Sequence, residues 1–341
     1  MRSVLPTLND LTLPPPASSL DEELSREIDH RTEWLARRFG VIDDRPGTMS
    51  IQSFRGGKFG TLSVLAYPNA DLDGLVLAND FNTYLFYVDD QAEEDENYGK
   101  RPELLEAYFQ GHVHALRTGQ APWARDPGTR LLLSLRDRLL RRASPRWLQR
   151  FAAEVEAYLL RGTLVGARHW TAGSVPTPTA YANQRAWDSA VFCSQDLAEV
   201  AGGAELSAEV RGDAAFQRSR ELVTRVVAFT NDLVSYPKEV QRHHSPNNLV
   251  HVEMVHAGVP LTEALWRVVD TVNDDVAAFE RVAADVASRA TTSADALATY
   301  QSCQRAWMAA NLTWSIRSGR YLDPDSPFVE LRTAQPDQAS A

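Results

Sequence analysis

The chain has little cysteine and no long apolar run. Two cysteines, Cys193 and Cys303, occur among 341 residues, and no CxxC pair is present. A disulfide framework or a cysteine zinc site is therefore not expected, and the cytoplasm is the predicted location. No window approaches the run of about 18 apolar residues that a membrane helix needs. The first 20 residues also lack the apolar core of a signal peptide, so we expect no membrane insertion.

An excess of positive charge is also missing. The sequence carries 35 Lys and Arg against 45 Asp and Glu, which gives a formal net charge of -10. A negative surface repels both the nucleic-acid backbone and anionic membranes, so we expect no nucleic-acid partner. The hydrophobic share of 44% is ordinary for a globular protein with a sizeable core.

Alternating strand patterns and internal repeats are absent as well, and helical periodicity fills the chain. We expect one all-α domain over residues 21–321, because no composition break interrupts it. Residues 1–20 predict an extended or disordered arm, and residues 322–341 predict a tail. The expected helices are Glu22–Phe39, Asn79–Asp95, Leu104–Arg117, Arg130–Arg142, Leu148–Trp170, Pro178–Val200, Leu206–Val234, Leu261–Ser288 and Ala296–Ser318.

The segment FNTYLFYVDDQAEED, residues 81–95, is an apolar helical run that ends in acidic residues. On a helix Asp89, Asp90 and Glu93 share one face, where like charges repel one another. A hard divalent cation such as Mg²⁺ turns that repulsion into binding. A solvated acidic helix end is the alternative interpretation. The aromatic and aliphatic stripe before the acidic residues favours the metal.

A second polar pattern is NDLVSYPKE, residues 231–239. Asn231, Ser235 and Glu239 follow one another at intervals of four, so their side chains share one helix face. An amide oxygen, a hydroxyl and a carboxylate are hard donors that suit one Mg²⁺. Pro237 lies inside the run, so we expect a kink or an early end of the helix there. The alternative interpretation is an ordinary polar helix end.

Two further features are weak on their own. Arg185 and Asp188 are spaced for an i,i+3 ion pair, which is common on helix surfaces and stabilises little. The pair Arg320-Tyr321 follows the last long expected helix.

Taken together, these four features resemble the bacterial class I terpene synthase family. The chain has an aspartate-rich motif after an aromatic run, a downstream NDxxSxxKE motif, an arginine 46 residues before that motif, and a C-terminal Arg-Tyr pair. The order and spacing are similar to those of the family from about Gly40 to Tyr321. The resemblance implies a single-domain helical bundle around a central apolar cavity, and it does not cover the arm or the tail.

The resemblance implies a role for each residue of the metal motifs. Asp89 would bridge two Mg²⁺ ions with support from Asp90 and Glu93, and three ions are expected in all. The third ion would be held by Asn231, Ser235 and Glu239. The first motif reads DDQAE, where the family often has aspartate last, so Glu93, Glu94 and Asp95 all remain candidates for its final position.

It also implies how the substrate is bound and ionised. Arg185 would sense the diphosphate, and Asp188 would link Arg185 to a helix break at Ser189. Lys238, Arg320 and Tyr321 would bind diphosphate oxygens. The carbocation left behind must be kept from water and stabilised by ring faces, each worth roughly 0.5–2 kcal/mol. The candidate rings are Phe81, Phe86, Phe192 and Trp314, and core packing is the alternative interpretation for each.

The expected activity is a Mg²⁺-dependent terpene cyclase that ionises a linear isoprenyl diphosphate and releases diphosphate. Farnesyl diphosphate is the favoured substrate, and geranylgeranyl diphosphate is the alternative. A homodimer is the family-level expectation. A chain-elongating prenyltransferase would need two DDxxD motifs, and a class II cyclase would need DxDD, which is absent. A non-catalytic helical scaffold explains the helices but not the shared face of Asn231, Ser235 and Glu239.

Overall fold

A computed structural model describes most of the chain as helix. The described residues are 4–43, 45–93, 98, 100–123, 125–289 and 294–332, and within them the side chain of Glu93 is not described. These residues form no strand, and their one β-bridge joins Ile42 to Met49. The predicted all-α class is therefore confirmed.

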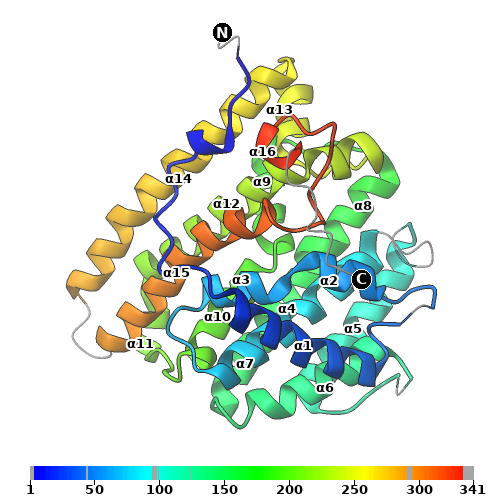
Figure 1. Cartoon of the computed structure of the whole chain (residues 1–341), viewed down its shortest axis with the longest axis vertical. Helices are drawn as coiled ribbons and strands as arrows, with labels where there is room; N and C mark the ends of the chain where they lie inside the picture. Colours follow the sequence, from blue (N-terminus) through cyan, green and yellow to red (C-terminus); the bar gives the residue numbers. More distant parts are fainter. Residues whose placement is uncertain are drawn as a thin grey trace.

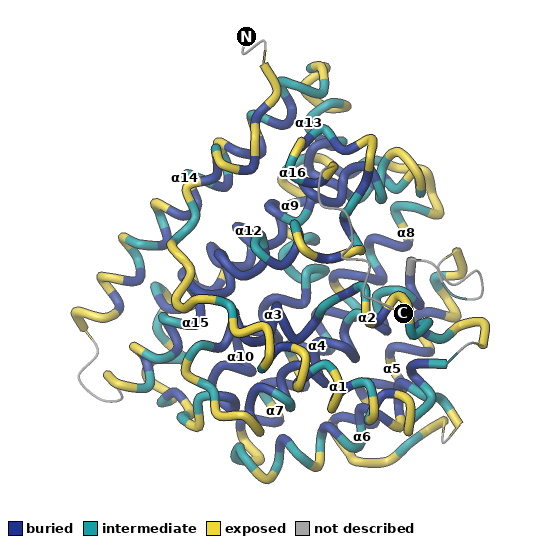
Figure 2. The backbone as a smooth tube through the Cα atoms, in the orientation of Figure 1, coloured by how far each residue is buried: buried dark blue, intermediate teal, exposed yellow. Residues whose placement is uncertain are grey.

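The helices form one bundle around a shared apolar core (Figure 1). Helices α3, α4, α10 and α12 lie at its centre, and Figure 2 shows them largely buried. The long helices α14 and α15 flank α12 on one side, and α5, α6 and α7 lie on the other side of α4. The bounds are α1 (Glu22–Phe39), α2 (Ile51–Gly57), α3 (Phe59–Ala66), α4 (Leu72–Glu93), α5 (Pro102–Thr118), α6 (Pro127–Leu139), α7 (Pro145–Ala157), α8 (Leu164–Ala172), α9 (Pro178–Asp188), α10 (Val191–Ala201), α11 (Ala208–Gly212), α12 (Ala214–Tyr236), α13 (Leu249–Ala257), α14 (Leu261–Arg289), α15 (Ala294–Ser315) and α16 (Val329–Arg332).

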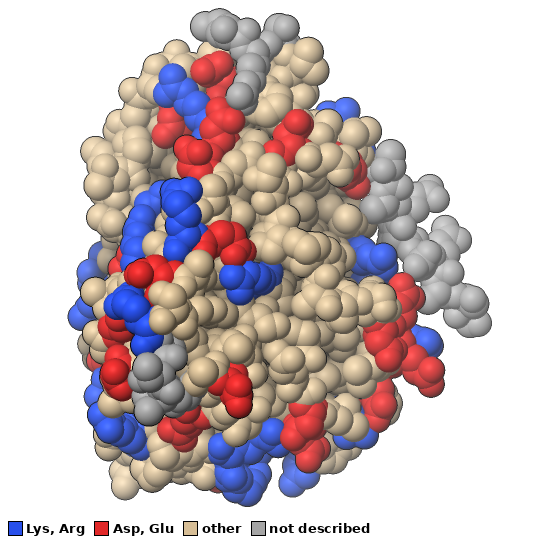
Figure 3. All heavy atoms as spheres, turned by 90° about the vertical axis from the view of Figure 1, so that its left-hand side faces the viewer, with Lys and Arg blue, Asp and Glu red and all other residues tan. Residues whose placement is uncertain are grey.

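The outer surface mixes charges of both signs. Figure 3 shows the face that α14 forms, where basic and acidic side chains lie beside one another. Ion pairs on this side of the molecule include Arg225–Asp275 at 2.8 Å, Arg289–Asp285 at 2.8 Å and Arg305–Glu280 at 2.6 Å. This face therefore offers no continuous basic patch.

The expected helix Pro178–Val200 is broken in two. Thr177 caps α9 by accepting a hydrogen bond from the Ala180 amide, and Pro178 occupies the first helical turn. Between α9 and α10, Ala190 has φ +56°, a left-handed conformation that is costly for a residue with a Cβ. Gly162 lies against the break so closely that a Cβ there would be 2.3 Å from the Asp188 nitrogen.

Two π-helical turns also interrupt the expected long helices. Tyr158–Thr163 separates α7 from α8, and Pro237–Arg242 continues α12. Pro237 has no N–H to donate, so the regular helix ends at Tyr236. The predicted disturbance at Pro237 is thus a widened turn. Such π turns are frequent at functional sites.

The described parts of the N-terminal and C-terminal segments pack on the bundle. Residues 4–20 run along α14 (Figure 1), where Asn273 accepts from the Thr12 amide at 2.7 Å. Leu8 and Leu11 of this arm are buried. Beyond Tyr321, Phe328 and Leu331 are buried and α16 forms, so residues 322–332 pack on the bundle.

Candidate active site

A cavity lies between α4, α12, α15 and the break between α9 and α10. The space between its lining atoms amounts to about 880 Å³, including the part that is open to solvent. The sequence-predicted residues that line it are Phe86, Asp89, Arg185, Asp188, Ser189, Asn231, Lys238, Glu239, Trp314, Arg320 and Tyr321.

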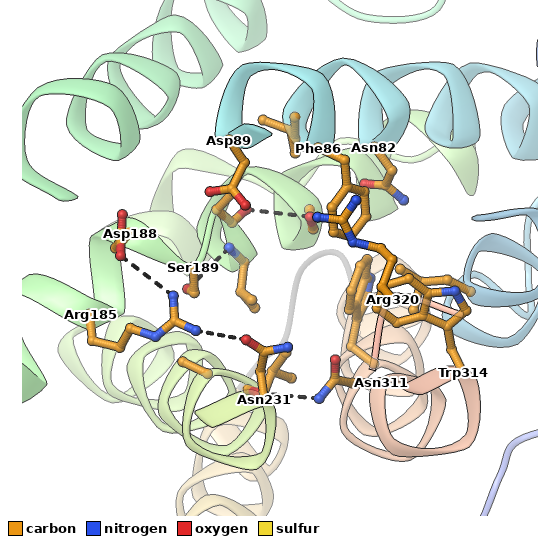
Figure 4. Close-up of a pocket in the computed structure, with 18 of the residues that line it drawn as sticks. Asn82, Phe86, Asp89, Arg185, Asp188, Ser189, Asn231, Asn311, Trp314 and Arg320 are labelled. Carbon is orange, nitrogen blue, oxygen red and sulfur yellow. Dashed lines mark hydrogen bonds and ion pairs between the residues drawn. The ribbon is translucent and has the colours of Figure 1, made fainter. Parts of the chain in front are cut away.

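Arg185 joins the helix break to α12. Its Nε donates to Asp232 Oδ1 and its Nη2 to Asn231 Oδ1, both at 2.8 Å, and its Nη1 lies 3.5 Å from Asp188 Oδ2. Burial opposes the charge of Arg185, but the carboxylates of Asp232 and Asp188 outweigh it and raise the pKa of Arg185. Burial raises the pKa of Asp188. The guanidinium is therefore a fixed positive group at the cavity wall (Figure 4).

The predicted second motif presents oxygen donors along one face of α12 and its π turn. Asn231 donates from Nδ2 to the Tyr321 hydroxyl at 2.9 Å, which directs Oδ1 toward Arg185. Ser235 is buried and does not line the cavity. Its hydroxyl donates to the Asn231 carbonyl at 2.8 Å, so its oxygen lone pairs remain for another partner. Glu239 accepts from Asn248 at 2.9 Å.

The acidic end of α4 lies on the opposite side of the cavity. Figure 4 shows Asp89 and Phe86 projecting from α4 toward the pair formed by Arg185 and Asn231. Asp90 accepts from Arg320 Nη2 at 2.9 Å and does not line the cavity. Burial disfavours the charge of Arg320, but the carboxylate of Asp90 outweighs this effect and raises the pKa of Arg320. Asp90 thus positions Arg320 at the cavity wall.

The last position of the acidic motif lies at the edge of the described part of the chain. Glu93 ends α4, but its side chain, like residues Glu94 and Asp95, lies outside the described part of the chain.

The candidate rings divide into two pairs. Phe86 packs against Trp314 with 5.4 Å between ring centroids and the ring planes tilted by 45°, and Arg320 lies 4.9 Å from the Phe86 centroid. Both rings line the cavity. Phe81 and Phe192 are not among the residues that line it. Phe81 packs in the core against Phe151, and Phe192 packs under the Arg220 guanidinium.

Two residues that hold the site together were not assigned a role from the sequence. Asp232 is fully buried and accepts from Arg185, from Tyr181 Oη at 2.7 Å and from the Leu249 amide at 2.9 Å. Asn248 donates from Nδ2 to the Asp232 carbonyl and to Glu239. Asp232 lies inside the NDxxSxxKE motif, so its place in the motif could have marked it as a residue of the site. Asn248 lies in a loop, and no pattern in the sequence marks it as part of the site.

The donor set suits a hard cation better than a soft one. Among the described residues, no group of three His, Cys, Asp or Glu side chains could hold a metal ion by itself. The described donors are carboxylate, amide and hydroxyl oxygens from Asp89, Asn231, Ser235 and Glu239, which are the ligands that Mg²⁺ prefers. The residues present therefore fit Mg²⁺ on two facing helices.

Comparison with known proteins decides the family. The family model described as "Terpene synthase family 2, C-terminal metal binding" matches residues 80–278, more than half of the chain. The chain belongs to the bacterial class I terpene synthases. The predicted enzyme class, a terpene cyclase that acts on an isoprenyl diphosphate, is thereby confirmed.

Several characterised relatives of this terpene synthase match most of its length. It is 31% identical to the (+)-T-muurolol synthase of Roseiflexus castenholzii, described as (2E,6E)-farnesyl diphosphate cyclizing, over 86% of this chain and 88% of that protein. It is 30% identical to pristinol synthase of Streptomyces pristinaespiralis over 91% of this chain and 84% of that one.

Solved structures match the fold of the terpene synthase. The 2-methylisoborneol synthase of Streptomyces coelicolor superposes with a TM-score of 0.82 at 22% identity, covering 94% of this chain and 99% of that one. Germacradien-4-ol synthase of Streptomyces citricolor superposes with a TM-score of 0.74 at 23% identity, covering 90% of this chain and 98% of that one. Within the described ranges, none of the helices combines the length and apolar character needed to cross a bilayer.

Proposed function

We propose that this terpene synthase ionises and cyclises farnesyl diphosphate with three Mg²⁺ ions. The observation that carries the proposal is that Asp89 on α4 and Asn231 and Glu239 on α12 and its π turn line the same cavity. The substrate is favoured because the relative from Roseiflexus castenholzii is described as cyclising (2E,6E)-farnesyl diphosphate.

The metal would be held from two sides. Asp89 would bind it on α4, with Asp90 acting through Arg320, and Asn231, Ser235 and Glu239 would bind it on the other side. When bound, the ions neutralise the charge of the leaving diphosphate. The side chain of Glu93 is a further candidate ligand on α4.

The protein's own cations complete the diphosphate site. Arg185, Lys238 and Arg320 line the cavity with the Tyr321 hydroxyl, so positive charge and a donor converge where the metal ligands lie. Because Arg185 and Arg320 are fixed by carboxylates, they need little reorganisation when the leaving group departs. Asp188 and Ser189 hold the break between α9 and α10 next to Arg185.

The apolar part of the cavity would control the fate of the carbocation. The rings of Phe86 and Trp314 form its wall, and Trp314 is held in place because its Nε1 donates to the Gly57 carbonyl at 2.7 Å. Ring faces stabilise the positive charge by roughly 0.5–2 kcal/mol each. The walls also exclude bulk water, which would quench the cation.

The test is to incubate the protein with geranyl, farnesyl or geranylgeranyl diphosphate and Mg²⁺. Diphosphate release is measured, and extracts are analysed by gas chromatography with mass spectrometry. We expect cyclic C15 products from farnesyl diphosphate and no diphosphate release when EDTA removes the metal. Preferred turnover of geranylgeranyl diphosphate would replace the substrate assignment.

A pair of variants tests the metal site. Glu239→Ala should abolish diphosphate release while the protein stays folded. Glu253→Ala removes a carboxylate outside the cavity, where it pairs with Arg267 at 3.3 Å, and should leave turnover unchanged. Full activity in Glu239→Ala would refute the ligand assignment.

A further inference from the structure

Several polar side chains of the cavity wall have no role above, and Asn82 is the one among them whose carbonyl oxygen is buried without a partner in the described part of the chain. Asn82 on α4 lines the cavity and is only 1% exposed, and its Oδ1 has no hydrogen-bond partner among the described residues. A buried amide oxygen without a partner is unfavourable, so native structures rarely leave one in place without a reason. In Figure 4 the Asn82 side chain projects from α4 on the same side as Phe86.

A chain of buried and partly buried hydrogen bonds fixes which end of the Asn82 amide has a protein partner. Asp29 accepts from the Gly60 amide at 2.6 Å and from Asn79 Nδ2 at 3.4 Å, and Asn79 Nδ2 also donates to Thr32. Asn79 must therefore present its Oδ1 to Ser63, whose hydroxyl donates to it at 2.9 Å.

The same chain of hydrogen bonds ends at Asn82, which lines the cavity. Because Ser63 uses its only proton on Asn79, its oxygen can only accept from Asn82, and it does so from Nδ2 at 3.4 Å. The Asn82 carbonyl oxygen is therefore the end of the amide that has no partner among the described residues. It can accept a hydrogen bond and cannot donate one.

The position of Asn82 separates it from the diphosphate site. Asn82, Phe86 and Asp89 lie at i, i+4 and i+7 of α4, so they share one face. Seven residues of helix span about 10 Å, which places the amide two turns away from Asp89. The cavity wall also contains Leu62, Val227 and Trp307, so part of its lining is apolar.

We propose that Asn82 Oδ1 holds a water molecule that captures a cyclised carbocation, so that the product is a terpene alcohol. The proposal rests on the proposed cyclase function. A water that donates one O–H to Asn82 keeps both oxygen lone pairs for the cation. One lone pair forms the new C–O bond, and the resulting oxonium loses one proton to a second water molecule, which passes it on to the diphosphate released in the ionisation step. The product is a neutral alcohol, and the oxygen comes from water.

The test uses farnesyl diphosphate and Mg²⁺ in H₂¹⁸O, with products identified by mass spectrometry. The wild-type protein should give an alcohol that carries ¹⁸O. In Asn82→Leu the fraction of alcohol among all products should fall about tenfold, the effect of losing one buried hydrogen bond, and hydrocarbons should replace it. Thr83→Val is the matched control, because Thr83 is equally buried on α4 with an unpartnered hydroxyl but does not line the cavity. It should leave the alcohol fraction unchanged.

The outcomes separate this proposal from the cyclase function. No diphosphate release from any substrate by the wild-type protein would overturn the cyclase function. Diphosphate release with only hydrocarbon products, or an alcohol without ¹⁸O, would overturn the water site alone. An unchanged alcohol fraction in Asn82→Leu would do so as well.

A second variant covers the case that Asn82→Leu does not fold. Ser63→Ala removes the acceptor of Asn82 Nδ2, so the amide is free to rotate. We expect the alcohol fraction to fall about threefold, a smaller effect because Asn82 itself remains. An unchanged fraction would overturn the proposal.

Discussion

The two ends of α12 both carry buried charge, but only one of them faces a cavity. Near the start of the helix, Arg220 donates to Asp196 at 2.8 Å and to Glu154 at 3.0 Å. Near its end, Arg185 donates to Asp232 and Asn231 at 2.8 Å. The first cluster is enclosed by α7, α10 and α15, whereas the second contributes lining residues to the cavity. Buried ion pairs alone therefore do not locate the active site. Oxygen donors and cations that converge on a shared space do.

The largest effect is expected from the end that faces the cavity. Asn231→Ala removes an amide oxygen from the proposed metal site and should lower the rate of diphosphate release by about a thousandfold or more. The midpoint of thermal unfolding should change little, because the residue lies at the cavity wall. The rate and the unfolding curve are both measured. A variant that unfolds but retains its rate while folded would contradict the assignment.

At the start of α12 we expect the opposite result, which is a loss of stability without a loss of rate. Asp196→Ala leaves Arg220 without its nearest carboxylate and should reduce the free energy of unfolding by about 3–5 kcal/mol. The rate per folded molecule should remain that of the wild type. Glu27→Ala, which breaks an exposed pair with Arg31, is the control and should cost at most about 1 kcal/mol in urea unfolding. If Asp196→Ala kept the stability of the wild type but lost its rate, the start of α12 would belong to the active site and this prediction would be contradicted.

Asp29 offers a further comparison, because it is a partly buried carboxylate that accepts hydrogen bonds from N–H donors. Burial raises its pKa to about 6, despite hydrogen bonds from Gly60 and Asn79 that lower it. A raised pKa means that the folded state binds the proton more tightly than the unfolded state, so stability rises as the pH falls through 6.

A comparison with Asp29→Asn isolates this group. Between pH 7 and pH 4 the wild type should gain about 2 kcal/mol of unfolding free energy relative to the variant. Urea unfolding at both pH values measures the difference. A constant difference would mean that Asp29 has an ordinary pKa.

The smallest effect on rate is expected at the aromatic wall. Phe86→Ala removes one ring face and should change product ratios severalfold, since a cation–π contact contributes roughly 0.5–2 kcal/mol. The Mg²⁺ dependence of the rate should stay the same. Product analysis against a magnesium titration tests this, and an unaltered product mixture would assign Phe86 to packing alone.

The sequence predicted the polar half of the site better than the apolar half. The face shared by Asn231, Ser235 and Glu239 follows from helix periodicity, and α1 has the predicted bounds Glu22–Phe39. Periodicity cannot separate a ring that lines a cavity from one that packs in the core, because both point inward. Phe81 packs against Phe151 and Phe192 lies beside the Arg220 guanidinium, and helix periodicity does not distinguish these positions from those of cavity-lining rings.

Short or uniformly apolar helices also escaped prediction. Every residue of α3 is buried, so it has no polar face to mark a period, and α2 and α13 are too short to show one clearly. The chain of hydrogen bonds from Asp29 to Asn82 joins α1, α3 and α4. Nothing local in the sequence indicates such contacts.

The close approach at Gly162 restricts how this enzyme can be redesigned. The obstacle to a side chain there is main-chain atoms at Asp188, which no compensating substitution of a neighbouring side chain can remove. Libraries that aim to alter the product should therefore keep position 162 fixed and diversify the cavity wall on α4 and α15.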